Sequence, residues 1–168
     1  MLETKRLWLR SFVPDDVSDV LEYTSQAAVA KNAGFMLCKT EQQALFFGQF
    51  LQKQDHLVIE LKEENKVIGN IGLSPLDVEK KHSFEVGYAL NKNYWQKGYM
   101  TEALSALCEA AKEKRIKVIE ARVADHNLAS IKVLERCGFK FVKKYVIAEW
   151  FVASENQTQL LFKKVLGG

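Results

Sequence analysis

Cysteine and proline are scarce in this sequence, and long apolar runs are absent. Only three cysteines and two prolines occur among its 168 residues. Cys38, Cys108 and Cys137 show neither metal-ligand spacing nor a Cys-x-x-Cys pair, so we expect no bound metal. An odd cysteine count is typical of a reducing compartment. No apolar run approaches the roughly 20 residues that a membrane span needs. We therefore expect a cytoplasmic protein without a membrane partner.

We also expect no leader peptide, linker or internal repeat. Residues 1–7 contain no basic stretch followed by an apolar one, which is the pattern of a secretory signal peptide. In a chain of this size one core can bury roughly 70% of the unfolded surface, so disulfides and metals are not required for stability. The sequence predicts one domain that covers residues 1–168.

Neither sign of charge dominates. The 24 Lys and Arg residues and the 21 Asp and Glu residues leave a net charge of +3. The basic residues are scattered, with no run of five or more, which argues against nucleic acid as the main partner. Hydrophobic residues make up 48% of the chain, as in globular proteins.

The hydrophobic pattern alternates between strand and helix periods. Period-two alternation and short apolar runs predict strands at residues 6–12, 57–61, 67–73, 84–90, 117–124, 139–147 and 158–165. Apolar stripes predict helices from residue 14 onward and at 41–53, 99–114 and 127–137. The order β-α-α-β-β-β-α-β-α-β-β indicates an α/β (α+β) fold, with a mostly antiparallel central sheet flanked by helices.

Two strand-loop-helix segments carry the chemical information. In the first, the strand from Glu85 to Leu90 leads through a loop to Gly98 and a long helix. The unpaired N–H groups and the positive dipole of a helix N-terminus favour phosphate. In the second, Asn127 opens a helix that carries Ser130 and ends before Gly138. Each segment alone also fits an ordinary turn with a helix cap, Thr101 in the first and Asn127 in the second.

Taken together, the segments resemble the Rim-type, ribosomal-protein N-acetyltransferase-like branch of the GNAT superfamily. The first reads Glu-Val-Gly-Tyr-x-Leu from Glu85 and Tyr-Trp-x-Lys-Gly-Tyr-x-Thr-Glu-Ala from Tyr94. The second reads Asn-x-Ala-Ser-x-x-Val-Leu-Glu-x-x-Gly-Phe from Asn127. The opening Glu-Thr-Lys-Arg-Leu-x-Leu-Arg from Glu3 is also similar, so the resemblance covers nearly the whole chain.

The resemblance implies an enzyme that transfers an acetyl group from acetyl-CoA to a primary amine by direct attack. It implies a strand that splays at a β-bulge between Val86 and Leu90, which frees backbone groups for the pantetheine arm. Glu85 would relay the proton of the amine, and Ser130 would donate a hydrogen bond to the departing sulfur. The residues that it implies for acetyl-CoA binding are Tyr88, Ala89, Leu90, Gln96, Lys97, Gly98, Tyr99, Met100, Thr101, Asn127 and Ser130.

The sequence departs from the family pattern at three positions. Gln96 stands where the family usually has glycine, and Met100 stands where it has alanine or glycine. Leu134 occupies the place of a tyrosine that protonates the thiolate in many members, and Ser130 is the implied substitute. From the residues alone, Glu85 is equally well interpreted as a base or as a surface carboxylate.

The acceptor amine is open among three hypotheses. They are the α-amine of a protein or peptide N-terminus, a small amine such as a polyamine or an aminoglycoside-like compound, and a non-catalytic acyl-CoA-binding module. Asp15, Asp16, Asp19 and Glu22 could form a polyamine site or simply an exposed helix face. The sequence is compatible with either a monomer or a homodimer.

Overall fold

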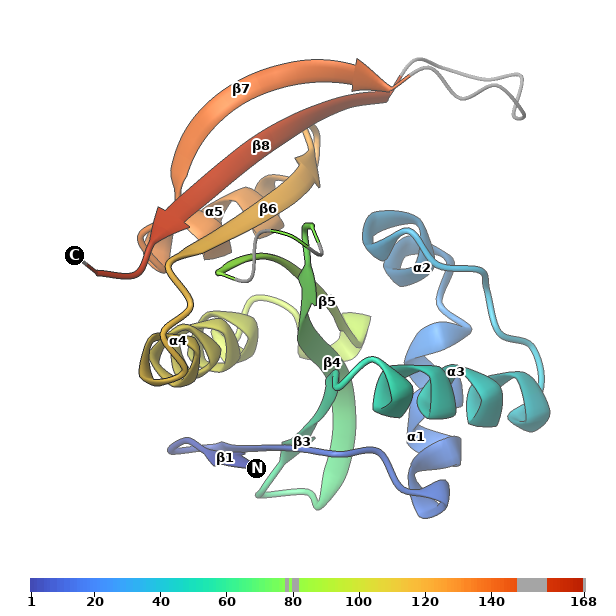
Figure 1. The fold of residues 1–168 in the computed structure, drawn as a ribbon. Coiled ribbons are helices and arrows are strands. Elements are labelled where there is room, and N and C mark those ends of the chain that lie inside the picture. Colours follow the sequence, from blue (N-terminus) through green and yellow to red (C-terminus); the bar gives the residue numbers. More distant parts are fainter. Residues whose placement is uncertain (78, 80–81, 148–156, 168) are drawn as a thin grey trace.

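The computed structural model describes residues 1–77, 79, 82–147 and 157–167, and among these residues eight strands form one sheet (Figure 1). Neighbouring strands are antiparallel except β5 and β6, which are parallel. In sheet order they are β1 (Leu2–Glu3), β2 (Leu7–Arg10), β3 (Leu57–Leu61), β4 (Lys66–Pro75), β5 (Ser83–Leu90), β6 (Val118–Ala124), β8 (Gln157–Val165) and β7 (Lys140–Ile147).

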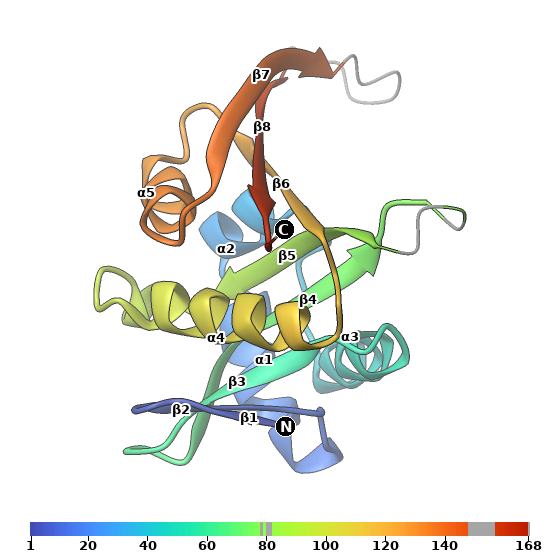
Figure 2. The ribbon, with the colours of Figure 1, turned by 60° about the vertical axis from the view of Figure 1, so that its left-hand side comes forward.

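Helices cover both faces of the sheet, as Figures 1 and 2 show. One face carries α1 (Val17–Thr24), α2 (Ala27–Ala33) and α3 (Glu41–Lys53). The other carries α4 (Tyr99–Glu113) and α5 (Leu128–Arg136). Two 3-10 turns, η1 (Pro14–Asp16) and η2 (Lys92–Tyr94), precede α1 and α4. This arrangement confirms the predicted mixed fold with its mostly antiparallel sheet.

The structure differs from the predicted element order at short segments. It adds β1, which has only two residues, and α2, whose sequence Ala-Ala-Val-Ala-Lys-Asn-Ala lacks a clear apolar stripe. The first predicted strand is shorter, Leu7–Arg10, and the first predicted helix begins as the 3-10 turn η1. The other predicted strands and helices are present with small shifts at their ends.

Two apolar clusters, one on each face, hold the layers together. One lies between the sheet and helices α4 and α5, and the other between the sheet and helices α1 to α3. Six consecutive residues of β4, from Val67 to Gly72, are buried because helices cover both sides of this strand. Cys38, Cys108 and Cys137 are all buried.

The sheet divides between β5 and β6. These strands pair only where Ser83, Phe84 and Glu85 lie beside Val118, Ile119 and Glu120. Beyond that point β5 continues beside β4 as far as Leu90, while β6 continues beside β8. Within the described part of the chain, the edge of β5 from Val86 to Leu90 therefore faces no strand, which agrees with the predicted splay. The predicted β-bulge is wrong, because the β4–β5 register is continuous from Gly69↔Leu90 to Pro75↔Phe84.

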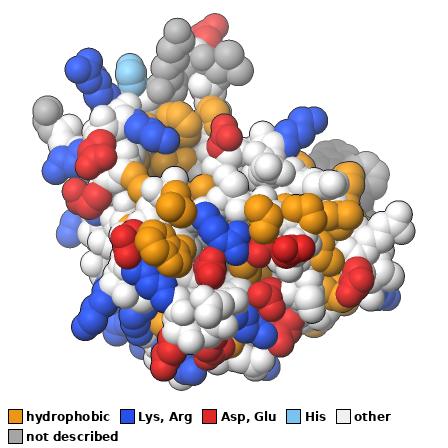
Figure 3. Space-filling view, turned by 90° about the horizontal axis from the view of Figure 1, so that it is seen from below, with side chains coloured by type: hydrophobic (Ala, Val, Ile, Leu, Met, Phe, Trp, Pro, Cys, Tyr) orange, Lys and Arg blue, Asp and Glu red, His pale blue; other side chains and the backbone are white. Residues whose placement is uncertain are grey.

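The surface mixes charges of both signs. Seen from the side of β1, α1 and α3, basic and acidic side chains are interspersed, with apolar side chains between them (Figure 3). None of the helices within the described part of the chain is both long enough and apolar enough to span a membrane.

Gly69 of β4 pairs with Leu90 at the end of β5, and the two backbones approach closely there. A β-carbon at Gly69 would lie 2.2 Å from the carbonyl oxygen of Ala89, whereas one at Gly87 would meet nothing within 4 Å. We expect Gly69→Ala to lower the free energy of unfolding by about 1–3 kcal/mol, as overpacking does. We expect Gly87→Ala to stay within about 0.5 kcal/mol of the wild type. Urea unfolding of both variants measures the difference, and equal stability would contradict the close approach.

Candidate active site

A cleft of about 610 Å³ opens where β5 and β6 part. Its walls are β5 from Glu85 to Leu90, β6 from Ala121 to Val123, the loop before α4 with the first turn of that helix, and α5. The end of α2 contributes Val29, Asn32 and Ala33. Because the divided sheet leaves one edge of β5 uncovered, backbone donors and acceptors are available along this wall.

All but one of the predicted site residues line this cleft. They are Glu85, Tyr88, Ala89, Leu90, Gln96, Gly98, Tyr99, Met100, Thr101, Asn127 and Ser130. The exception is Lys97, whose side chain lies outside the lining, with Nζ 5.5 Å from the centre of the Tyr94 ring. Its carbonyl oxygen instead accepts a hydrogen bond of 3.0 Å from Arg6 Nη1. Lys97 therefore contributes to the loop through its backbone.

The loop before α4 has the backbone shape of an anion-binding turn. Gln96 and Gly98 adopt positive φ angles of 64° and 80°, and α4 begins at Tyr99. Alternation of left-handed with ordinary residues turns successive N–H groups toward a common point. Thr101 lies within the first turn of α4, so the alternative in which it caps the helix is wrong; Gly98 occupies the N-cap position.

The left-handed angle at Gln96 explains the family preference at this position. A φ of 64° is unfavourable for a residue with a β-carbon, whereas glycine adopts it freely. Gln96 therefore keeps the loop geometry at a cost in backbone strain.

Arg6 fastens the loop to the N-terminal strands. Its Nε donates to Glu102 Oε2 at 2.6 Å, and its guanidinium lies 4.3 Å from the centre of the Tyr99 ring. Glu102 also accepts from Thr4 Oγ1 at 2.6 Å and from the backbone N–H of Arg6 at 2.8 Å. Partial burial opposes ionisation of Glu102, but these hydrogen bonds outweigh it and hold the pKa of Glu102 below its ordinary value.

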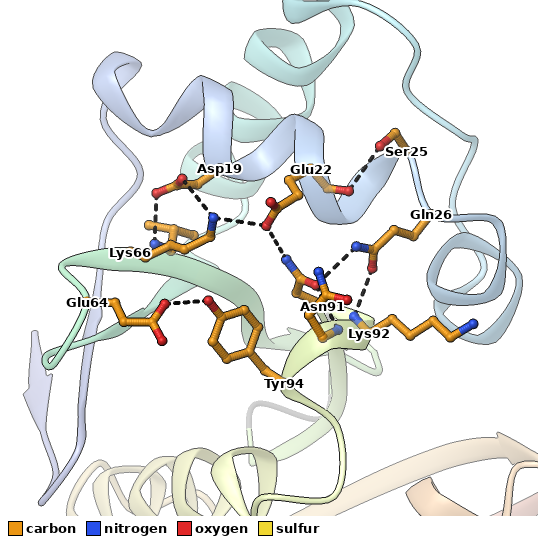
Figure 4. Close-up of polar contacts among 11 residues, drawn as sticks. Asp19, Glu22, Ser25, Gln26, Glu64, Lys66, Asn91, Lys92 and Tyr94 are labelled. Atoms are coloured by element: carbon orange, nitrogen blue, oxygen red, sulfur yellow. Dashed lines mark hydrogen bonds and ion pairs between the residues drawn. The ribbon is translucent and has the colours of Figure 1, made fainter.

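The other end of the loop is fastened to α1 (Figure 4). Asn91 is fully buried, donates to Glu22 Oε2 at 2.6 Å, and accepts from Gln26 Nε2 at 3.0 Å. Tyr94 donates to Glu64 Oε2 of the β3–β4 turn at 2.5 Å. The loop is thus fixed at both ends by side chains from distant parts of the chain.

Tyr88 and Ser130 form a hydroxyl pair in the cleft. The two oxygens lie 2.5 Å apart, and Asn127 Oδ1 accepts from the Ser130 backbone N–H at 3.2 Å. Asn127 is therefore the helix cap that its position predicted. Burial raises the pKa of Tyr88 to about 12, so this hydroxyl keeps its proton near neutral pH. Leu134 is buried in the core, 1% exposed, and takes no part in the cleft lining.

Glu85 does not stand alone in the cleft. Its Oε2 accepts from Arg122 Nη1 at 2.7 Å, and both side chains are 37% exposed. Arg122 also lies 3.6 Å from Glu120 Oε2 through its Nη2. Sequence reasoning missed Arg122, the Tyr88 hydroxyl as a partner of Ser130, and the contribution of α2. The parallel β5–β6 register places Glu85 beside Glu120, and Arg122, two residues further along β6, reaches Glu85 with its side chain. This register has no signal in the sequence.

The fold and the cleft agree with known proteins. The family model of the acetyltransferase (GNAT) domain matches residues 6–140. The chain belongs to the GNAT acetyltransferase family. It is 32% identical over 152 residues to the N-acetyltransferase YnaD of Bacillus subtilis, a match that covers 86% of this chain and 87% of that protein. The resemblance stated from the motifs is thereby confirmed, and the chain is an acetyl-CoA-dependent N-acetyltransferase of this family.

Solved GNAT structures share the whole fold. A GNAT-family acetyltransferase from Bacillus anthracis is 26% identical, with a TM-score of 0.86 and coverage of 98% of both chains. At 18% identity, the microcin C7 self-immunity acetyltransferase MccE, solved in complex with acetyl-CoA and AMP, gives a TM-score of 0.82 over 96% of this chain and 93% of that one. A ribosomal-protein-S5-alanine acetyltransferase from Vibrio fischeri, 21% identical, gives 0.74 over 97% and 94%. These last two show a common fold, with which the Rim-type resemblance is consistent.

Gln96 and Gly98 both have positive φ angles, but substitutions at the two positions should affect acetyl-CoA binding in different ways. Gly98→Ala places a β-carbon at a φ of 80° and should cost about 1–2 kcal/mol of stability together with affinity for acetyl-CoA. Gly98→Glu adds an anion where phosphate would lie and should abolish binding. Gln96→Gly relieves the same kind of strain, so it should keep the wild-type affinity. Calorimetry with acetyl-CoA measures all three; similar losses in Gly98→Ala and Gln96→Gly would refute this account.

Proposed function

We propose that this acetyltransferase transfers the acetyl group of acetyl-CoA to the α-amine of a protein or peptide N-terminus. The observation that supports the proposal is that few acidic side chains line the cleft. Among the described residues that line it, Glu85 is the only acidic one, and Arg122 is already bonded to it. Such a site suits an amine that needs little help to lose its proton.

The loop at residues 96–101 and the free edge of β5 fit the two ends of acetyl-CoA. Backbone amides at the start of α4 suit the pyrophosphate, and the uncovered edge from Val86 to Leu90 suits the amides of the pantetheine arm. Lys132 and Arg136, one helical turn apart on α5, add positive charge to the cleft wall. The complex of MccE with acetyl-CoA supports this choice of donor for the fold.

The chemistry requires a neutral amine, a stabilised oxyanion and a leaving thiolate. The amine nitrogen bonds to the thioester carbon and the carbonyl becomes a tetrahedral oxyanion, which then collapses as the carbon–sulfur bond breaks. The amine's proton passes to Glu85 or through it to water. A backbone N–H on the free edge of β5 polarises the carbonyl. The Tyr88–Ser130 pair donates a hydrogen bond to the departing sulfur, a task for which the hydroxyl proton retained by Tyr88 is suited.

An α-amine is the easier substrate for such a site. Its ordinary pKa is about 7.7–8.0, against about 10.4 for lysine. At neutral pH roughly a tenth of α-amines are therefore nucleophilic, against well under a hundredth of lysine side chains. The resemblance to the Rim-type branch points to N-terminal substrates as well.

A polyamine acceptor is less well supported because the acidic residues of the first helix have other partners. Asp16 accepts from Arg10 Nη1 at 2.8 Å, and Asp19 accepts from the Val67 backbone N–H at 3.0 Å. Glu22 accepts from Asn91. Neither these residues nor Asp15 lines the described cleft. A purely acyl-CoA-binding module would not need the Tyr88–Ser130 pair.

The hydroxyl pair predicts a loss in turnover. Ser130→Ala and Tyr88→Phe should each lower kcat about 10-fold or more while changing the Kd of acetyl-CoA little, because the hydrogen bond strengthens as the thiolate forms. The double variant should lose little more than the worse single one, since the two groups act as a unit. Ser105→Ala, an exposed serine on α4, is the control. Steady-state kinetics and calorimetry give both quantities, and an unchanged kcat would return Ser130 to a structural role.

The acceptor class is tested with matched peptides. One peptide has a free N-terminus and a blocked lysine, and the other has a blocked N-terminus and a free lysine. We expect acetylation of the first at least about 10-fold faster near pH 7, in line with the difference in free amine. Mass spectrometry locates the acetyl group. Acetylation of the lysine peptide alone would overturn the proposal, and activity on spermidine alone would favour the small-amine hypothesis.

A further inference from the structure

A second, smaller cavity adjoins the cleft beside the Glu85–Arg122 ion pair. It has a volume of about 170 Å³ and lies between the end of α2, β6 and β8. The two cavities share Asn32, Ala33 and Arg122 as lining residues. Arg122 therefore faces both spaces, with Glu85 beside it in the larger one.

The lining of this second cavity is basic. Lys31, Arg122 and His126 contribute to it, and none of its described lining residues is acidic. Carboxylates lie beside two of these basic residues: Glu85 and Glu120 are 2.7 and 3.6 Å from Arg122, and Asp125 is 3.5 Å from His126. A cationic acceptor arm, such as a second amine of a polyamine, would be repelled there, whereas an anionic group would be attracted.

Charged groups of a substrate can replace either partner of the Glu85–Arg122 ion pair. Both side chains are more than one third exposed, and an ion pair in such a position contributes little net stability. A substrate ammonium that approaches Glu85 competes with Arg122 for the same carboxylate. If the substrate brought only that positive charge, the guanidinium would lose its shorter contact and retain Glu120 at 3.6 Å.

We propose, resting on the proposed function, that the acceptor is zwitterionic, with a carboxylate or phosphate group beside the amine. The ammonium replaces Arg122 at Glu85, and the anion replaces Glu85 at Arg122 and enters the second cavity beside Lys31. Both charges of the original pair therefore keep a partner of opposite charge after the exchange. The volume of this cavity, about 170 Å³, is several times the roughly 30 Å³ that a water molecule occupies, which leaves room for a carboxylate or a phosphate.

Three matched pairs of acceptors test the proposal and separate the sources of the anion. They are alanine and alaninamide, Ala-Glu-amide and Ala-Gln-amide, and O-phosphoethanolamine and ethanolamine. We expect kcat/KM for the anionic member of at least one pair to exceed that of the neutral member at least 10-fold. The pair that shows this preference identifies the anion as an α-carboxylate, a side-chain carboxylate or a phosphate. A preference confined to alanine or O-phosphoethanolamine would support the zwitterionic acceptor and overturn the peptide N-terminus as its class.

Variants assign the preference to the cavity. Arg122→Gln should reduce the ratio of anionic to neutral kcat/KM to about one, and Lys31→Gln should reduce it several-fold. Lys53→Gln, an exposed residue at the end of α3, should leave the ratio unchanged. Arg122→Gln also removes the partner of Glu85 and can lower activity toward every acceptor, but such a loss leaves the ratio unchanged. Lys31→Gln provides the test if Arg122→Gln does not fold.

The failures are distinguishable. Equal turnover of anionic and neutral α-amines, or a preference that survives both Arg122→Gln and Lys31→Gln, would overturn the zwitterion proposal and leave the α-amine proposal intact. Turnover of none of these amines, with acetylation of a lysine side chain instead, would overturn both.

Discussion

The short parallel contact between β5 and β6 is the constraint on which the rest of the molecule depends. Three residue pairs join the strands, and each strand then follows a different antiparallel neighbour, β4 or β8. The backbone of β5 beyond Glu85 would be costly to leave without hydrogen bonds in a dry core. It is acceptable here because the uncovered edge forms a wall of an open cleft. The loop before α4 and helix α5 occupy the other sides of the same gap.

Rigidity around that gap comes from residues outside it. Arg6 and Glu102 fasten one end of the α4 loop, and buried Asn91 fastens the other through Glu22 of α1. A loop whose amides are already aligned loses little conformational entropy when an anion binds. The N-terminal strands and first helix, which contribute nothing to the cleft lining, thereby determine the shape of the loop.

The parts of the site that could be predicted are those formed by residues close together in the sequence. A strand, a glycine-containing loop and a helix follow one another along the sequence, so the predicted residues from Glu85 to Thr101, apart from Lys97, and from Asn127 to Ser130 line one cleft. The pairs Glu85–Arg122 and Tyr88–Ser130 depend on how β5 lies beside β6 and α5, which no local period encodes. Helix α2 escaped notice because an alanine-rich segment of seven residues has no distinctive stripe. The expected bulge was inferred from resemblance, whereas the divergence arises from the change of strand partner.

The burial of the cysteines bears on how the reaction can be followed. Cys38, Cys108 and Cys137 all lie in the interior. Burial raises the pKa of Cys108 to about 11 and also raises that of Cys137, so few of these groups exist as reactive thiolates. A disulfide reagent such as 5,5′-dithiobis(2-nitrobenzoic acid), added to the folded enzyme, will therefore react mainly with the thiol of released coenzyme A. Turnover can therefore be recorded continuously by absorbance. A slow rise in signal from the enzyme alone, without acetyl-CoA, reports opening of the protein core.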